Sequence, residues 1–135
     1  MRSEAKNPQN WFDFAEEDLV RAYRRFSEGD FSDCLFHLQQ CAEKAMKGRL
    51  IALGWQLQKI HDLAPLIEEL ATAGVDCRWF DESADVLATE YVATRYPGFE
   101  DAPVATEELR TLVLNTTKLF EQLTGRTYSG PPLPA

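Results

Sequence analysis

The chain has 135 residues, of which 44% are hydrophobic and 27% charged, and its formal net charge is -8 at pH 7. This length and composition predict one soluble globular domain, and no apolar run approaches the roughly 20 residues that cross a bilayer. The negative charge argues against a protein that coats nucleic acid through its whole surface, because such binding needs many contacts between cations and phosphates. The N-terminal MRSEAKNPQN lacks the apolar region of a secretory signal, so we expect a cytoplasmic protein.

Two long amphipathic helices are predicted in the first half of the chain. Asn7 followed by Pro8 is a typical helix start, and we expect the first helix to end near Gly29. Asp30 can cap a second helix that runs to about Gly54 and is the longest. The apolar residues of each helix fall on one face at 100° per residue. They are Trp11, Phe12, Ala15, Leu19, Ala22, Tyr23 and Phe26 in the first, and Phe31, Cys34, Leu35, Leu38, Ala42, Ala45, Met46 and Leu53 in the second.

Three further helices are predicted between residues 62 and 125. Asp62 can cap the third helix, which Gly74 ends. The fourth starts at Asp81 or Ser83 and must end by Tyr96, because proline disfavours helical geometry in the residue before it. Thr106 opens the fifth, which runs up to Gly125. The inward sets are Leu63, Leu66, Ile67 and Leu70; then Ala84, Leu87, Ala88 and Tyr91; then Leu109, Leu112, Val113, Thr116, Phe120 and Leu123.

The periodicity is helical almost throughout, and no long stretch alternates apolar and polar residues as a half-buried strand does. We therefore expect an all-α fold, an antiparallel up-and-down bundle of four to five helices. Residues 1–125 form the predicted domain. Residues 126–135, RTYSGPPLPA, form a Pro-rich tail that we expect to be disordered.

The second helix carries a polar stripe with a local excess of positive charge. Spacings of three and four residues place its members on one side, opposite the apolar face. They are Asp33, His37, Gln40, Lys44 and Lys47. The stripe is either an ordinary solvated face or a site for a small anion or a short RNA. Phe36 and Ile51 lie on or beside this stripe. They are either part of a surface that contacts a partner or isolated hydrophobic residues on the surface.

Several other residues are candidates for chemistry. Arg49 and Arg95 fall on inward faces, where a guanidinium needs a carboxylate or an anionic ligand unless its long side chain reaches water. His61 can fix the turn before Asp62, and His37 is expected to be exposed on the second helix. The cysteines form no CxxC pair, and the two histidines lack further ligands at zinc spacing, so neither a metal site nor a cofactor is predicted.

Three segments in order resemble one known family. They are DLVRAYRRFSEGDFSDCLFHLQQCAEKAMKGRLIALG, then KIHDLAPLIEEL, then EYVATRYPG, and together they span roughly residues 11–123. They resemble the HEPN family (higher eukaryotes and prokaryotes nucleotide-binding). The resemblance implies an all-α bundle that usually dimerises and is found beside small nucleotidyltransferases, often in toxin–antitoxin pairs. Many HEPN proteins are metal-independent RNases whose motif is Arg, four to six residues, then His.

The chain departs from that RNase motif, because no histidine follows Arg95 and neither histidine stands at that distance after any arginine. The resemblance therefore favours a noncatalytic HEPN module. Its expected form is a homodimer that binds a nucleotide, a short RNA or a nucleotidyltransferase partner. The residues offered to the ligand are Lys44, Lys47, His61, Tyr91 and Arg95. The alternatives are an RNase toxin with a non-standard active site, which leaves the enzyme question open, and a scaffold whose second helix serves dimerisation alone.

Overall fold

The protein is all-helical in the part that the structure describes. This computed structural model describes the backbone of residues 3–95 and 104–135 and the side chains of residues 5–90 and 104–135. Those ranges contain five α-helices, which are α1 (Pro8–Ser27), α2 (Phe31–Ala52), α3 (Leu63–Thr72), α4 (Asp81–Arg95) and α5 (Thr106–Thr124). Short 3-10 turns, η1 (Ser3–Lys6) and η2 (Arg78–Phe80), precede α1 and α4. None of the described helices has the length and apolarity needed to cross a membrane.

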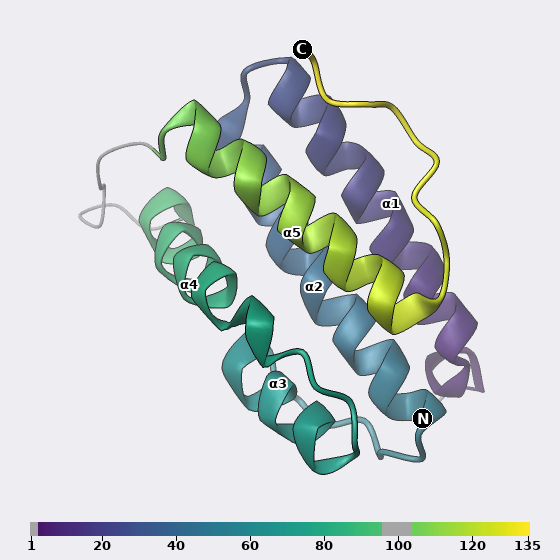
Figure 1. The fold of residues 1–135 in the computed structure, drawn as a ribbon. Coiled ribbons are helices and arrows are strands. Elements are labelled where there is room, and N and C mark those ends of the chain that lie inside the picture. Colours follow the sequence, from purple (N-terminus) through teal and green to yellow (C-terminus); the bar gives the residue numbers. More distant parts are fainter. Residues whose placement is uncertain (1–2, 96–103) are drawn as a thin grey trace.

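The helices form the predicted up-and-down bundle, with α2 at its centre. In Figure 1, α1 and α4 run in one direction while α2 and α5 run in the other, and the short α3 lies in the connection between α2 and α4. α2 packs against each of the other four helices, most extensively against α1. Because it is enclosed by neighbours on several sides, even polar residues of α2 lose contact with water. The sequence predicts an amphipathic helix with one polar face in solvent. The structure differs, because neighbouring helices cover much of the polar face of α2 as well.

Most helix ends lie where the sequence places them. Asn7 caps α1 by accepting a hydrogen bond from the backbone N–H of Gln9 (3.0 Å), and Asp30 caps α2 by accepting one from Asp33 (3.2 Å). Asp62 precedes α3 as predicted, but its side chain makes no capping hydrogen bond. α5 begins at Thr106 with Ala105 at the cap position, and Gly125 ends it in the left-handed conformation (φ 74°). That conformation suits glycine, which has no Cβ to clash.

Gly48 marks the closest approach of α1 to α2. A Cβ added there would lie 2.6 Å from a ring carbon of Phe12 and 2.8 Å from the Cβ of Trp11. The two helices can therefore pack at this distance only because residue 48 has no side chain. The local sequence around Gly48 does not predict this contact, because the ring of Phe12 comes from another helix.

One apolar core joins all five helices, and most of the predicted inward residues lie in it. Leu53, just after α2, and Ala88 on α4 are exceptions, because both are exposed. The side chain of Tyr91, predicted on the same face, lies outside the described residues. All three cysteines are buried and unpaired, as expected of packed thiols. Burial raises the pKa of Cys34 to about 12 and that of Cys77 to about 11, and it also raises the pKa of Cys41.

The C-terminal tail, residues 126–135, differs from the expectation of disorder. It has no regular secondary structure, but it runs back along α1 in the direction opposite to α5 (Figure 1). Tyr128 and Leu133 pack against the apolar core, and Arg126 makes ion pairs with α1. The composition suggested disorder because it contains three prolines and few apolar residues, whereas the structure holds the tail through a small number of specific side chains.

Candidate functional site

The first polar cluster of α2 is built on the buried carboxylate of Asp18, which projects from α1 and is 3% exposed. Its Oδ2 lies 2.6 Å from Nζ of Lys44, and its Oδ1 lies 2.8 Å from Nδ1 of His37. A buried carboxylate requires such partners, because leaving it unpaired in the interior costs several kcal/mol, on the order of the penalty for any desolvated ion. The cluster therefore ties α1 to α2.

His37 lies between two carboxylates and is not the exposed residue that the sequence predicts. Its Nε2 lies 3.4 Å from Oδ2 of Asp33, and its side chain is only 12% exposed. Asp33 also accepts a hydrogen bond from Nε of Arg25 (2.9 Å). His37 is enclosed because Asp18 from the neighbouring helix covers this side of α2. His37 links the helices and offers little surface to a ligand.

The second polar cluster is built on Glu43, in the middle of α2. Nζ of Lys47 donates to Oε2 of Glu43 at 2.9 Å, and both residues are buried. Nδ1 of His61 lies 3.1 Å from the same oxygen. Gln39 completes the cluster, because its amide Nε2 lies 3.3 Å from both Oε1 of Glu43 and the carbonyl oxygen of His61. Nε2 of Gln40 in turn donates to the side-chain amide oxygen Oε1 of Gln39 at 2.7 Å.

His61 is the accessible member of this second cluster. Its side chain is 76% exposed, whereas those of Glu43 and Lys47 are 10% and 5% exposed. A carboxylate that holds one ring nitrogen fixes the orientation of an imidazole, and the exposed ring can then meet a ligand or exchange a proton with it. Chemically, the cluster can bind an anionic or hydrogen-bonding group at His61 while Lys47 balances the charge of Glu43.

The structure brings together only part of the predicted ligand set. Lys47 and His61 share Glu43, whereas Lys44 belongs to the Asp18 cluster, and each lysine is neutralised by a carboxylate. Lys47 is 4% exposed, so its ammonium group is not accessible to a ligand. The sequence placed it on a polar stripe that could be solvated. The predicted side chains of Tyr91 and Arg95 lie outside the described residues.

Two acids that organise these clusters were not among the predicted site residues. Asp18 carries a signal in the sequence, because it lies beside the apolar face formed by Ala15, Leu19 and Ala22. The sequence signal for Glu43 is weaker. This residue lies beside the polar stripe, and Lys47 follows it by one helical turn. The i,i+4 spacing indicates Lys47 as a partner of Glu43, whereas nothing in the sequence shows that Asp18 meets Lys44 and His37.

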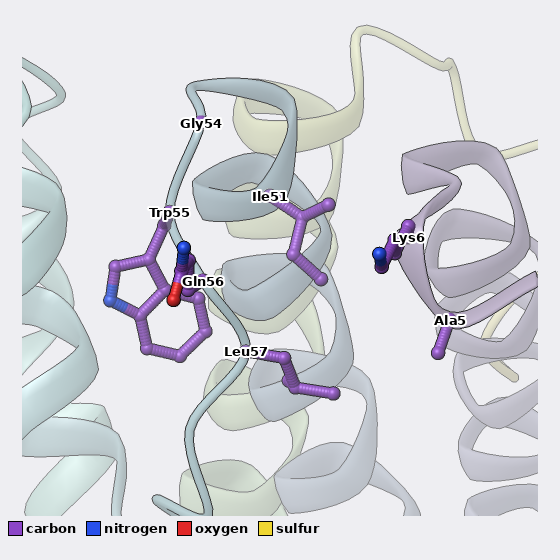
Figure 2. A pocket seen from close by; sticks show the side chains of 7 residues that line it. All are labelled: Ala5, Lys6, Ile51, Gly54, Trp55, Gln56 and Leu57. Atoms are coloured by element: carbon purple, nitrogen blue, oxygen red, sulfur yellow. The ribbon is translucent and has the colours of Figure 1, made fainter. Parts of the chain in front are cut away.

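A groove lies at the C-terminal end of α2, with a cavity volume of about 490 Å³. In Figure 2, Ile51 and Leu57 point toward the N-terminal segment that carries Lys6, while the ring of Trp55 turns away to the other side. The lining residues are Ala5, Lys6, Ile51, Gly54, Trp55, Gln56 and Leu57. Ile51 therefore forms a wall of a groove and is not a scattered surface hydrophobe. The lining of the groove is mixed, with apolar side chains beside the amide of Gln56 and the ammonium of Lys6.

Comparison with family models gives a match to the HEPN domain over residues 8–125. This chain belongs to the HEPN family. The match covers all five α-helices of the structure, and it agrees with the resemblance read from the sequence. Comparisons with curated proteins and with solved structures gave no match.

Within this HEPN domain, both histidines lie upstream of the fourth helix and both face carboxylates. Among the described residues, Arg25 and His37 share Oδ2 of Asp33, at 2.9 Å and 3.4 Å, whereas the ion pair of His61 is with Glu43. Eleven residues separate Arg25 from His37 in the sequence, so this pair does not match the family's RNase motif of Arg, four to six residues, then His. Arg49 was predicted to point inward, and its Nε is indeed buried without a hydrogen-bond partner there.

Proposed function

We propose that this HEPN domain is a noncatalytic binding module. In this proposal it acts as a homodimer and binds a nucleotide or a nucleotidyltransferase partner, in a toxin–antitoxin-like or nucleotide-responsive system. The observation that carries the proposal is the absence of the family's RNase spacing: no histidine follows Arg95, and neither histidine stands four to six residues after an arginine. A metal-independent RNase needs an acid or base beside the phosphate, but His37 is enclosed between Asp18 and Asp33, and the exposed His61 has no arginine among its described partners.

The charges of α2 also favour binding over cleavage of long RNA. Lys44 and Lys47 are each balanced by an acid, and the net charge of the chain is -8. Long RNA would be repelled by such a surface, whereas a compact ligand or a folded partner can contact His61 and the accessible part of Lys44. In this proposal Lys47 acts through Glu43, and Tyr91 and Arg95 remain further candidates for the ligand surface.

Exposed apolar side chains on the α1–α2 side support association with a second chain. Phe14 of α1 is 56% exposed, and Nζ of Lys44 lies 5.9 Å from the centre of its ring. Ile51 adds apolar surface further along α2. A stable dimer would cover such residues and bury on the order of 800 Å² per partner. Light scattering at tens of micromolar should therefore give the mass of a dimer, and the mass of a monomer would remove this part of the proposal.

Calorimetry tests the binding itself. Titration with ATP, with GTP and with the protein encoded by the adjacent gene should give heat for at least one of them. His61→Ala should weaken that binding about tenfold or more, which is the loss of roughly one good polar contact. Lys118→Ala is the matched control, because this exposed lysine of α5 lies over the ring of Trp79 in η2 and belongs to neither polar cluster of α2. Absence of heat with every titrant would overturn the proposal.

One observation favours a second candidate, an RNase with a non-standard site. The exposed imidazole of His61 is held by a buried carboxylate, which is an arrangement that acid–base catalysts use. Cleavage of RNA without a metal ion, lost in His61→Ala and Glu43→Gln, would support this candidate. Intact RNA after prolonged incubation would exclude it.

A further inference from the structure

The C-terminal tail is held on the α1–α5 side of the bundle by side chains of both helices, and Arg126 is its first attachment. Nη1 of Arg126 lies 2.8 Å from Oδ1 of Asp13 and 2.9 Å from Oε1 of Glu16. Nη2 donates to the amide oxygen of Gln9 at 2.9 Å. One face of α1 therefore presents three oxygen acceptors to a single guanidinium, and two of them are charged.

Tyr128 is the second attachment. Its ring stacks on that of Tyr23, with 4.3 Å between the ring centres and 19° between the planes. Its backbone N–H donates to Oε2 of Glu121 at 2.7 Å, and its hydroxyl donates to the carbonyl oxygen of Pro131 at 2.7 Å. Tyr23 is itself fixed by a hydrogen bond of 2.7 Å between its hydroxyl and that of Thr117 on α5. The ring of Tyr23, on which Tyr128 stacks, is therefore held in place by contacts within the helix bundle.

The far end of the tail is held near the start of α5. Nη1 of Arg110 donates to the carbonyl oxygen of Pro134 at 2.8 Å, and Leu133 packs against the apolar core. Exposure is uneven along the segment, as expected of an extended ligand whose side chains point in turn toward and away from a surface. The half-buried members are Arg126, Tyr128, Pro131 and Leu133, and the exposed ones are Thr127, Ser129, Gly130, Pro132, Pro134 and Ala135.

These contacts are those of a receptor with a peptide. Side chains of α5 bind two backbone groups of the tail, and α1 supplies a carboxylate pair for a cation and a ring for stacking. None of them depends on the covalent link through Gly125. Proline keeps such a segment extended before it binds, which lowers the entropy lost on docking. A surface depression of about 410 Å³ on α1, lined in part by Asp13 and Glu16, adjoins the arginine site.

We propose that this surface, which we call the tail seat (Gln9, Asp13, Glu16, Tyr23, Arg110 and Glu121), is a binding site for an extended peptide of a partner protein. The peptide carries an arginine two residues before a tyrosine, followed by prolines. The chain's own tail is the resident occupant and competes with the partner. The acidic pair on α1 supplies the charge complementarity for the partner's arginine. The site is separate from His61 and goes beyond the proposed function.

Fluorescence anisotropy with a labelled peptide of the sequence RTYSGPPLPA tests the proposal on the full-length chain. The double variant Arg126→Ala/Tyr128→Ala frees the seat and should bind the peptide at least tenfold more tightly than the wild type. The reason is that the resident tail has an effective concentration on the order of millimolar and excludes the free peptide. A peptide in which the tyrosine is replaced by alanine is the matched control and should bind at least tenfold more weakly.

Asp13→Asn/Glu16→Gln in the freed background removes the charge but keeps the helix, and it should lower the affinity for the peptide about tenfold. Circular dichroism establishes that each variant is folded. If the double variant unfolds, Arg126→Ala alone carries the same comparison. A folded, freed variant that does not bind the peptide at 1 mM, or that binds the tyrosine and alanine peptides equally, would overturn the proposal. Either result leaves the nucleotide and partner assays of the proposed function unaffected.

Discussion

Nζ of Lys47 lies 2.9 Å from Oε2 of Glu43, and this ion pair is enclosed by the bundle, with side chains that are 5% and 10% exposed. The same oxygen of Glu43 faces the exposed ring of His61. One buried carboxylate therefore connects an interior cation to the surface residue that we propose as a ligand contact. The consequences of this arrangement can be measured separately for stability and for binding.

Removal of Glu43 should destabilise the fold strongly. Glu43→Ala leaves the ammonium of Lys47 buried without its partner, and breaking a buried pair in this way costs roughly 3–5 kcal/mol. Urea unfolding followed by circular dichroism measures the free energy of unfolding. The double variant Glu43→Ala/Lys47→Met should recover much of the loss, since no uncompensated charge remains.

The control for that experiment is an exposed ion pair. Glu107 is 83% exposed and lies 3.6 Å from Nε of Arg110, so Glu107→Ala should change the free energy of unfolding by at most about 1 kcal/mol. If Glu43→Ala lowers the free energy of unfolding no more than Glu107→Ala does, the ion pair of Glu43 and Lys47 is not buried.

Gly48→Ala should loosen the contact between α1 and α2. The added Cβ would lie 2.6 Å from the Phe12 ring, so the helices or the ring must shift, and such overpacking costs about 1–3 kcal/mol. This loss opposes the gain of up to about 1 kcal/mol that alanine brings to a helix. The free energy of unfolding should therefore fall, and a variant more stable than the wild type would contradict the close approach.

The helices were predictable from the sequence because their signals are local. Asn7, Pro8 and Asp30 mark helix starts, and the left-handed Gly125 ends the last helix, so each acts within one turn of its own position. The role of Gly48 was not predictable, because it depends on a ring that arrives from another helix. A single helix cannot show how many neighbours will surround it.

The same reason explains the errors at the candidate site. His37 and Lys47 lie on a polar stripe of α2, and a stripe predicts solvent only when nothing packs over it. Asp18 arrives from α1 and encloses His37, and α2 is central to the bundle. The pair of Glu43 and Lys47 follows the i,i+4 spacing of a helix, whereas the contacts of Lys44 with Asp18 and of His61 with Glu43 join distant positions that no spacing rule records.

The three thiols should be unreactive in the folded protein. Burial raises the pKa of Cys34 to about 12 and that of Cys77 to about 11, so the reactive thiolate is scarce at pH 8. A thiol reagent such as DTNB at pH 8 should modify fewer than one thiol per chain in minutes without denaturant, and three in 6 M guanidinium chloride. Rapid modification of the native chain would contradict the burial of these residues.

The attachment of the tail should weaken at alkaline pH. Burial, with a further contribution from Tyr23, raises the pKa of Tyr128 above its ordinary value of 10.0. The unfolded chain therefore loses the tyrosine proton before the folded chain does, and the stability contributed by the neutral side chain is complete below pH 10 and declines above it.

Tyr128→Phe separates this effect from the titration of other groups. The variant lacks the ionisable hydroxyl, so its free energy of unfolding should fall less between pH 8 and pH 11 than that of the wild type. Equal declines in the two proteins would show that Tyr128 is not shielded by Tyr23 as the structure indicates.

Incubation of purified protein with structured and single-stranded RNA, in the presence of EDTA, tests the noncatalytic assignment most directly. Gel electrophoresis should show the RNA unchanged after hours at micromolar protein, because His37 is enclosed between two acids, no histidine follows Arg95, and neither histidine stands four to six residues after an arginine. Cleavage that requires His61, and that disappears in His61→Ala, would contradict the account.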